Sequence, residues 1–343
     1  MENSHPMTLD EFLTQWHEPS DTVPVHTSGS TGIPKLLLVE KERMRASARL
    51  TCRFLNLQPG DTALLCMPLD YIAGKMMVVR SLEWHLRLLS VPPSSHPLKD
   101  LTAAPVFAAM VPLQVYQSLQ LERERELLQQ IRHLLIGGGV IDEALEKRLS
   151  AFPHAVWSSY GMTETLSHIA LRRVNGPERS LWYTPLEGVR VRLSEDGCLC
   201  VHAPWVGSQE LMTNDCACLH PDGKRFRILG RKDNVIDSGG IKIQIEEVER
   251  LLHPHLSFPF LITSCRDERL GEQVVMMVEN QEWLENNQGN LTSLCASLLP
   301  PYWRPRQYMA VGKIPLTETG KPARAEARKM AALWWETHEM PSR

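Results

Sequence analysis

The sequence lacks any apolar run long enough to cross a membrane, which in a helix takes about 20 consecutive apolar residues. Its first residues, MENSHPMTLDEFL, contain neither the basic stretch nor the apolar stretch of a secretory signal. The formal net charge of -3 and the pI of about 6.5 provide no basic field to attract nucleic acid or an anionic membrane. We therefore expect a cytoplasmic protein that neither inserts into a membrane nor binds nucleic acid.

Cysteine is present, but its arrangement does not resemble a disulfide framework. In a cytoplasmic chain of this size, the eight cysteines are expected to be thiols. Two C-x-C pairs, Cys198 with Cys200 and Cys216 with Cys218, raise the question of a thiolate metal site. Each pair lies in an alternating segment, which places its two thiols on one face of a strand. The sequence leaves open whether these four thiols bind a metal.

The first half of the chain alternates apolar, strand-like runs with helical patterns. This alternation is typical of βα units around a largely parallel sheet, whose ligands bind at the carboxyl ends of the strands. The runs IGGG and SSYGMTE both lie at such ends. The expected strands are 62–67, 86–91, 106–111, 133–139 and 155–161, and the clearest expected helices are 41–55 and 142–152.

The pattern changes after about residue 185 to short strands and turns, with hairpins expected around an Asp-Gly turn and at 220–230. A helix, two strands and a closing helix follow, which indicates a small α+β domain. We predict an α/β protein in which residues 1–230 form a largely parallel sheet domain with a β-hairpin region. Residues 231–343 form a small, mobile C-terminal domain, and the hinge lies near residues 231–233.

The stretch HTSGSTGIPK combines hydroxyls, glycines and a lysine between the strand-like segments TVPV and LLLV. Glycine lets the backbone approach a ligand, and successive N–H groups beside hydroxyls form a concavity suited to phosphate. The stretch departs from the common G-x-x-x-x-G-K-[ST] pattern, because no hydroxyl follows its lysine. We predict a nucleotide phosphate loop formed by Thr27, Ser28, Gly29, Ser30, Thr31, Gly32 and Lys35.

Four further stretches follow the phosphate loop: YGMTE (160–164), TND (213–215), GRKDNVIDSGGIKIQIEEVE (230–249) and PLTETGKPAR (315–324). In this order, the five motifs resemble the adenylate-forming superfamily of acyl-CoA synthetases, peptide-synthetase adenylation domains and luciferases. The resemblance covers nearly the whole chain. Within the superfamily, SYGMTETLSHI and DNVIDSGGIKIQIEEVE look most like the o-succinylbenzoate-CoA ligases of menaquinone biosynthesis.

The resemblance implies an ATP-dependent ligase that uses ATP, Mg²⁺ and coenzyme A on a small-molecule carboxylate. The carboxylate attacks the α-phosphate and gives an acyl-adenylate, and the CoA thiolate then displaces AMP after the small domain rotates. In the first step Lys321 is the implied adenylation lysine, Thr163 contacts phosphate and Glu164 holds Mg²⁺. The oligomeric state is left open.

The resemblance also assigns the rest of the nucleotide site and the CoA tunnel. Residues 27–35 surround the β- and γ-phosphates, Asp233 is the hinge, and two sets of residues bind the nucleotide and the pantetheine arm. The nucleotide set frames the adenine and contacts the ribose: Gly138, Gly139, Tyr160, Asp215 and Arg231. The pantetheine set is Ser238, Gly239 and Gly240.

The carboxylate substrate is expected near Tyr71, at a gate where many family members have a histidine or another aromatic residue. Tyrosine fills space and donates a hydrogen bond, but it cannot carry positive charge. Lys75 and Arg80 follow on an expected helix, about 140° apart around its axis, so they cannot both face one pocket. We expect Lys75 to face a second carboxylate, with Arg80 behind it; the alternative is that both are solvated surface cations.

The other side of the substrate is expected to be formed by residues that follow the strand end at Tyr160. Ser167 and His168 are expected one helical turn after Glu164, where they could hydrogen-bond a benzoate carboxylate. Gly161 and Met162 complete the expected substrate site.

One departure from the superfamily concerns length. Members normally carry a long region before the phosphate loop, which here begins at residue 27, so part of the large domain is expected to be absent. The alternatives are ligation of another aryl or acyl acid, a carrier-protein thiol in place of CoA, and a non-catalytic nucleotide-binding remnant.

Overall fold

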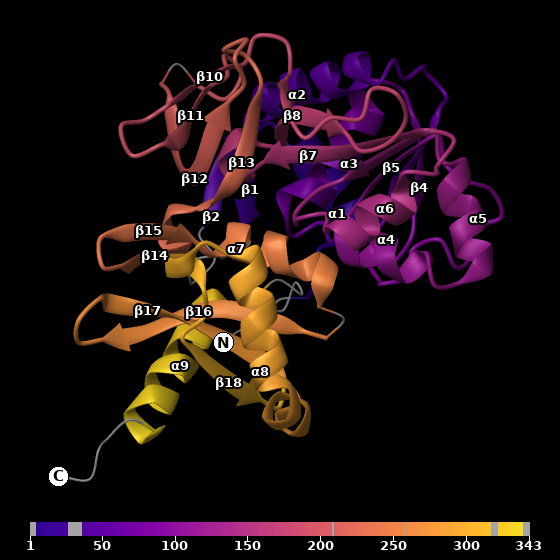
Figure 1. Ribbon diagram of the computed structural model, residues 1–343. Helices are drawn as coiled ribbons and strands as arrows, with labels where there is room; N and C mark the ends of the chain where they lie inside the picture. Colours follow the sequence, from indigo (N-terminus) through magenta and orange to yellow (C-terminus); the bar gives the residue numbers. More distant parts are fainter. Residues whose placement is uncertain (1–4, 27–35, 208, 257, 317–321, 339–343) are drawn as a thin grey trace. The chain divides into compact units, whose positions relative to one another are not determined.

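The computed structural model describes residues 5–26, 36–207, 209–256, 258–316 and 322–338 (Figure 1). The chain folds into two compact units. The first comprises residues 1–192, 200–212 and 219–227, and the second comprises residues 193–199, 213–218 and 228–343. The domain boundary after residue 230 and the hinge near residues 231–233 stay predictions.

The first unit contains a seven-stranded sheet of the expected, largely parallel kind. Five neighbouring strands are parallel, and the last two, β8 and β9, are antiparallel. The order across the sheet is β4 (Arg87–Ser90), β3 (Thr62–Leu65), β5 (Phe107–Met110), β6 (His133–Ile136), β7 (Ala155–Gly161), β8 (His168–Arg173) and β9 (Thr184–Pro185). The five strands expected from the apolar runs are confirmed.

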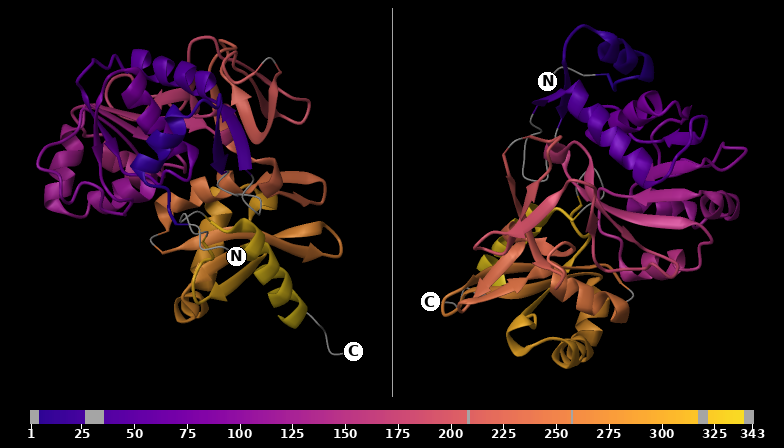
Figure 2. Two further views of the ribbon diagram at one scale, coloured as in Figure 1. Left: turned by 180° about the vertical axis from the view of Figure 1, so that it is seen from behind. Right: turned by 90° about the horizontal axis from the view of Figure 1, so that it is seen from above.

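Helices cover both faces of this sheet (Figure 2), which explains why its strands read as continuous apolar runs. Ala63 and Leu65 of β3 pack with helices α2 and α3 on one face, while Leu64 packs with α4, α5 and α6 on the other. The bounds are α2 (Lys41–Phe54), α3 (Ile72–Glu83), α4 (Pro112–Ser118), α5 (Glu122–Gln130) and α6 (Glu143–Leu149). The helices expected at 41–55 and 142–152 are confirmed.

The N-terminal part of the first unit forms helix α1 (Leu9–His17) and the antiparallel strands β1 (Thr22–His26) and β2 (Leu36–Glu40). A capping box between Thr8 and Glu11 begins α1, whose Phe12 and Trp16 are buried in the core. The predicted phosphate loop between β1 and β2 lies outside the described residues.

The β-hairpin region is a four-stranded sheet in the order β10 (Arg190–Leu193), β11 (Cys198–His202), β12 (Leu211–Leu219) and β13 (Phe226–Arg231). Both expected hairpins are confirmed. The Asp-Gly turn joins β10 to β11, and Gly197 in that turn has a positive φ of 75°. The residues of this sheet are divided between the two units.

The rest of the second unit is the expected small α+β fold. Its five-stranded sheet contains β14 (Val235–Ser238), β15 (Ile241–Gln244), β16 (Phe260–Asp267), β17 (Gly271–Glu279) and β18 (Gln307–Val311). Apolar side chains of β16 and β17 pack against α7 (Ile245–Leu252) and α8 (Gln281–Leu298) on one face and α9 (Arg324–His338) on the other. Short 3-10 turns are η1 (Thr163–Thr165), η2 (Lys232–Asn234), η3 (His253–His255) and η4 (Pro301–Trp303).

Across the described ranges, no helix has both the length and the apolar character needed to cross a membrane.

Candidate functional site

Three residues that were predicted to bind the nucleotide lie at the carboxyl ends of two neighbouring parallel strands of the large sheet. Gly138 and Gly139 lie two and three residues after the end of β6, and Tyr160 is the last but one residue of β7. Gly138 has a positive φ of 74°, a conformation that glycine adopts at no steric cost. The carboxyl ends of these strands therefore present exposed backbone beside an aromatic ring, as a flat heterocycle would require.

Tyr160 belongs to a small aromatic cluster within the first unit. Its ring packs edge-to-face on Phe226 with ring centroids 5.3 Å apart, and lies 6.0 Å from the ring of Tyr183. The hydroxyl of Tyr183 is 2.8 Å from Ser158 Oγ. These contacts hold the half-buried Tyr160 ring in place.

After Tyr160 the chain makes a tight turn that reverses its direction. Thr165 Oγ1 accepts from the Met162 N–H at 2.9 Å and donates to the Ser167 carbonyl at 2.7 Å. A Cβ on Gly161 would lie 2.3 Å from that same carbonyl oxygen, so glycine is required for the close approach. The helical turn expected between Glu164 and His168 is wrong, because the 3-10 turn ends at Thr165 and His168 begins β8.

Glu164 sits in this turn with its side chain exposed, and it makes no hydrogen bond or ion pair with the described residues. No group of three or more His, Cys, Asp and Glu side chains in the described ranges is arranged to hold a metal. A Mg²⁺ bound through one carboxylate together with phosphate oxygens fits this surrounding, since Mg²⁺ commonly takes one or two carboxylates with substrate phosphates. A cage made of protein ligands alone does not fit.

A buried polar network connects α3, the turn after Glu164 and α2. Arg80 Nη2 donates to Ser167 Oγ at 2.5 Å. Ser167 Oγ lies 3.3 Å from His168 Nδ1, and His168 Nε2 lies 3.1 Å from Thr51 Oγ1. Thr51 Oγ1 in turn donates to the Ser47 carbonyl at 3.2 Å. The donors and acceptors of this network can be assigned consistently. The guanidinium donates to Ser167 Oγ, the Ser167 hydroxyl donates to His168 Nδ1, and His168 Nε2–H donates to Thr51 Oγ1.

This network fixes the charge of its members. Burial, aided by the nearby charge of Arg80, holds the pKa of His168 well below its usual value, so the imidazole is neutral. Burial lowers the pKa of Arg80 to about 10, which still leaves the guanidinium charged near neutral pH. Arg80 is 2% exposed, and its Nε–H has no hydrogen-bond partner among the described residues. A buried, charged N–H without a partner is costly, and an acceptor oxygen of a ligand would remove that cost.

Lys75 lies on the same helix, but it contacts a different part of the unit. Its Nζ is 3.0 Å from Met7 Sδ and 5.0 Å from the centroid of the Phe12 ring. Burial lowers the pKa of Lys75 to about 8, against a smaller opposing effect of Asp70. With exposures of 1% for Lys75 and 2% for Arg80, the alternative that both are solvated surface cations is wrong. The predicted divergence of the two side chains is confirmed.

Tyr71, the predicted gate residue, is half-buried and forms the N-cap position of α3. Sequence reasoning missed Thr51, which completes the buried network from α2 although it is 117 residues from His168. Its position in the interior of a helix gave no local signal for this role.

The second unit positions the residues predicted to lie near the ribose and the hinge. The Arg231 guanidinium bonds to Asp215 Oδ1 at 3.4 Å and to Asp233 Oδ2 at 2.9 Å. Asp215 is 8% exposed, and its N–H donates to Thr213 Oγ1. Lys232 forms an exposed ion pair with Asp196 at 2.7 Å. Acidic and basic groups therefore alternate around the start of η2.

Ser238, Gly239 and Gly240, the residues predicted for the pantetheine tunnel, form the turn of the β14–β15 hairpin. Gly239 and Gly240 have positive φ values of 62° and 80°, as a type I′ turn requires. Ser238 pairs with Ile241 across the turn. The geometry of this turn thus accounts for the two glycines, independently of the contacts to pantetheine that were predicted for them. Lys321, the predicted adenylation lysine, lies outside the described residues.

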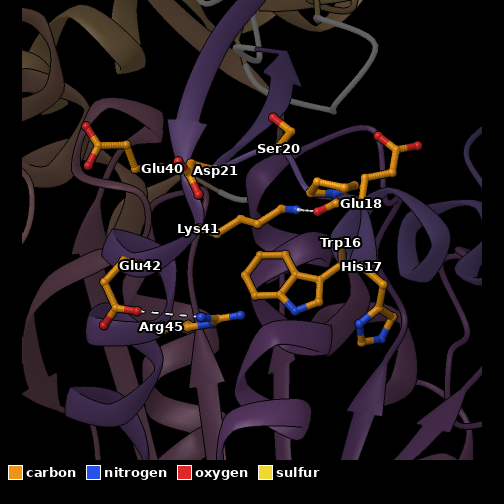
Figure 3. Close-up of a pocket in the computed structure, with 10 residues that line it drawn as sticks. Trp16, His17, Glu18, Ser20, Asp21, Glu40, Lys41, Glu42 and Arg45 are labelled. Carbon is orange, nitrogen blue, oxygen red and sulfur yellow. Dashed lines mark hydrogen bonds and ion pairs between the residues drawn. The ribbon is translucent and has the colours of Figure 1, made fainter.

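A pocket of about 590 Å³ lies in the N-terminal part of the first unit (Figure 3). Lys41 Nζ donates to the Glu18 carbonyl at 2.8 Å and lies 5.9 Å from the Trp16 ring centroid, while Arg45 pairs with Glu42. The lining contains charges of both signs, and none of its residues belongs to the predicted site.

The pattern of the AMP-binding enzyme family matches residues 9–207 of the chain. This chain belongs to that family. A crystal structure described as an acyl-CoA synthetase (AMP-forming)/AMP-acid ligase II-like protein, from Dyadobacter fermentans, is similar to this AMP-binding protein at 34% identity and a TM-score of 0.63. The match covers 94% of this chain and 93% of that one. The predicted membership of the adenylate-forming superfamily is confirmed.

Curated relatives refine the similarity. A 2-succinylbenzoate-CoA ligase of Salmonella typhimurium is 29% identical over 74% of this chain, and one of Bacillus cereus is 26% identical over 89%. The matched regions span 57% and 69% of those relatives' own lengths. An o-succinylbenzoate coenzyme A synthetase of Bacillus subtilis, solved with ATP and magnesium ion, shares the fold at a TM-score of 0.71 and 22% identity; it is covered over 69% of its length, and this chain over 88%.

Proposed function

We propose that this chain is an AMP-forming acid–CoA ligase. In the first step, a carboxylate oxygen of the substrate attacks the α-phosphorus of ATP, an acyl–O–P bond forms and pyrophosphate leaves. In the second, the CoA thiolate attacks the acyl carbonyl carbon and AMP leaves. The family membership and the exposed backbone at the carboxyl ends of β6 and β7, beside Tyr160, support this proposal.

The residues that would bind the nucleotide follow the predicted set. Gly138, Gly139 and Tyr160 would flank the adenine, and Asp215, with Arg231 beside it, would accept the ribose hydroxyls. The phosphate-loop residues and Thr163 would contact the phosphates. The exposed Glu164 carboxylate would hold Mg²⁺, which neutralises charge that develops on the phosphate oxygens.

The substrate we propose is o-succinylbenzoate, which carries two carboxylates. The observation that carries this choice is the buried Arg80 Nε–H, which has no partner among the described residues and could receive the carboxylate that is not activated. Ser167 and His168 hold the guanidinium in position from one side. These contacts favour Arg80 over Lys75, whose ammonium lies against Met7 and Phe12. The names of the curated relatives support the same substrate.

Pyrophosphate release over a panel of carboxylates, with and without CoA, tests the proposal. We expect release with o-succinylbenzoate to exceed that with benzoate or a fatty acid, and thioester to form only when CoA is present. Preference for a monocarboxylate would move the assignment to another aryl or acyl acid. Adenylate without thioester would indicate a carrier-protein thiol acceptor, and ATP binding without release would indicate a nucleotide-binding remnant.

The two half-reactions separate the predicted roles of Lys321 and Asp233. Lys321→Ala should slow adenylation by about 100- to 1,000-fold, as expected for one preorganised charge-stabilising donor, and leave thioester formation from supplied acyl-adenylate intact. Equal loss of both half-reactions would make Lys321 structural.

Asp233→Pro should fix φ at the proposed hinge, so that adenylate accumulates without thioester. Normal overall turnover in this variant would place the rotation elsewhere. We also propose a lid domain that begins at residue 231, pantetheine contacts at Ser238, Gly239 and Gly240, and a cytoplasmic location, where ATP and CoA are both available.

A further inference from the structure

Two cysteines lie opposite each other on the neighbouring strands β11 and β12. The connection between these strands, residues 203–210, is too short for a parallel crossover, so the strands run antiparallel. The Ala217 N–H donates to the Gly197 carbonyl at 3.0 Å. One step further along each strand, Cys198 and Cys216 therefore face each other.

This position is the kind of cross-strand pair that a disulfide can bridge. The single bond from the Ala217 N–H to the Gly197 carbonyl places these two residues opposite each other in the hydrogen-bonding register, while the Gly197 N–H donates to the Ser194 carbonyl in the turn. Cys198 and Cys216 therefore occupy the next, non-hydrogen-bonded position, where Cα atoms lie about 4.5 Å apart. Disulfides join Cα atoms that are about 4.4 to 6.8 Å apart. The Cys198 thiol is near enough to Cys216 to contribute to the raised pKa of that thiol. Closing the bridge requires no change of register.

The two thiols differ in access. Cys198 is 4% exposed, whereas Cys216 is partly open to solvent. All eight cysteines of the chain are reduced in this structure. A small oxidant would thus reach Cys216 first, and Cys198 would be the neighbouring thiol that completes the reaction.

We propose that Cys198 and Cys216 form a redox-modification site that hydrogen peroxide converts into a cross-strand disulfide. The Cys216 sulfur attacks one peroxide oxygen, the O–O bond breaks, and a sulfenic acid and one water are formed. The Cys198 sulfur then attacks the sulfenic sulfur, the S–O bond breaks, and a second water leaves with the thiol proton. In total the two thiols lose two protons and two electrons, and the peroxide is reduced to two waters.

The surroundings set how fast this site reacts. Burial raises the pKa of Cys216 to about 11, with further contributions from Cys198, Glu246 and Asp215. Because the thiolate is the nucleophile, the rate of cross-linking should rise by about tenfold per pH unit from neutral pH toward this pKa. The site would then be slow in an ordinary reducing cytoplasm and respond to sustained oxidation.

The bridge would also stiffen a segment that the proposed nucleotide site uses. Cys216 directly follows Asp215 in β12, and Cys198 lies two residues from Asp196, which pairs with Lys232. This consequence rests on the proposed function, whereas the existence of the disulfide does not.

Treatment of the reduced full-length chain with hydrogen peroxide, followed by thiol alkylation, digestion and mass spectrometry, tests the proposal. We expect one linked peptide pair that contains Cys198 and Cys216, with a mass lower by two hydrogen atoms. Cys198→Ser and Cys216→Ser should each abolish this pair. Cys200→Ser and Cys218→Ser, which change the second cysteine on each strand, should retain it.

A disulfide that joins other cysteines, or that joins two chains, would overturn the proposal. Oxidised methionines in the same sample show that the peroxide has reacted. If both thiols are still completely alkylated in such a sample, the proposal is also overturned. Near-ultraviolet circular dichroism of each reduced variant shows whether it is folded. If Cys198→Ser does not fold, Cys216→Ser and its more conservative partner Cys216→Ala decide the outcome, because the half-exposed Cys216 tolerates either change.

Discussion

The buried cations of helix α3 in the first unit and the buried Glu249 of the second unit have different kinds of partner. In the first unit, Arg80 and Lys75 are buried, and their hydrogen bonds go to neutral groups, a serine hydroxyl and a thioether. In the second unit, the buried Glu249 is bonded through both carboxylate oxygens to Arg324, with two distances of 2.6 Å. Removing the partner of a buried charge is strongly destabilising, whereas a buried charge without an ionic partner is a cost that folding alone does not explain. This contrast is why we associate Arg80 with a ligand and Glu249 with stability.

Glu249→Leu should show the largest effect of this comparison. It leaves the partly buried Arg324 guanidinium without its carboxylate and removes the acceptor of the Ile262 N–H. We expect the free energy of unfolding to fall by about 3–5 kcal/mol, measured by denaturant titration followed by tryptophan fluorescence.

The double variant Glu249→Leu/Arg324→Leu is the matched control, because it removes both charges together. It should recover part of the loss. If the single and double variants were equally unstable, the pair would contribute only through packing, and the contrast with Arg80 would weaken.

Arg80→Met tests the opposite case. Removing a buried charge that lacks a carboxylate partner should leave the unfolding free energy unchanged or raise it. Adenylation of o-succinylbenzoate should nevertheless fall by about 100-fold in kcat/KM, or about 2.7 kcal/mol, because a charged contact to the substrate is lost. Stopped-flow or coupled pyrophosphate assays measure this effect.

Lys75→Met is the matched control for activity, since it removes a buried cation from the same helix. We expect its discrimination between o-succinylbenzoate and benzoate to match that of the wild type. If Lys75→Met lost the preference and Arg80→Met kept it, the original expectation for Lys75 would be restored.

The sequence predicted the residues at the carboxyl ends of β6 and β7 better than it predicted the buried network around Arg80. The strands of the large sheet are buried on both faces, so they read as apolar runs, and the motifs after β6 and β7 followed directly. Contacts such as Thr51 with His168 join positions far apart in the chain, and nothing in the local pattern specifies them. The orientation of Arg80 toward Ser167 was beyond the sequence for the same reason.

Two helices show the limits of local patterns in another way. Helix α8 was not predicted because QEWLENNQGNLTSLCASL is rich in residues with modest helix propensity and contains Gly289. Three of its residues are buried, so its apolar stripe is thin. Helix α1 was missed although Thr8 and Glu11 form a capping box, a signal that the sequence did contain.

The pH dependence of stability gives a third, intermediate effect. The pKa of Lys75 is about 8 in the folded protein against an ordinary value of 10.5, so between these values the unfolded chain binds more protons than the folded one. Stability from this residue should therefore rise with pH, by about 2 kcal/mol between about pH 7.5 and pH 9.5. Lys75→Met should lack this rise, which denaturant titrations at both pH values would detect. Parallel slopes in the two proteins would contradict the burial of the ammonium.

Asp196→Asn should produce the smallest effect, and that smallness is informative. Asp196 and Lys232 are both exposed, at 61% and 52%, and an exposed pair is weak because water and salt screen it. The ion pair does lower the pKa of Asp196, first through its hydrogen bond to Lys232, but solvent limits what this interaction adds to folding. We expect an unchanged denaturation midpoint for Asp196→Asn at low and at high salt. Lys232 of this pair directly precedes Asp233. A hinge has to exchange its contacts as it turns, so weak contacts suit such a segment. Asp196→Glu, which keeps the charge, is the control. If Asp196→Asn clearly lowered the denaturation midpoint at both salt concentrations and Asp196→Glu did not restore it, the segment would be a rigid part of the second unit. That result would count against a hinge there.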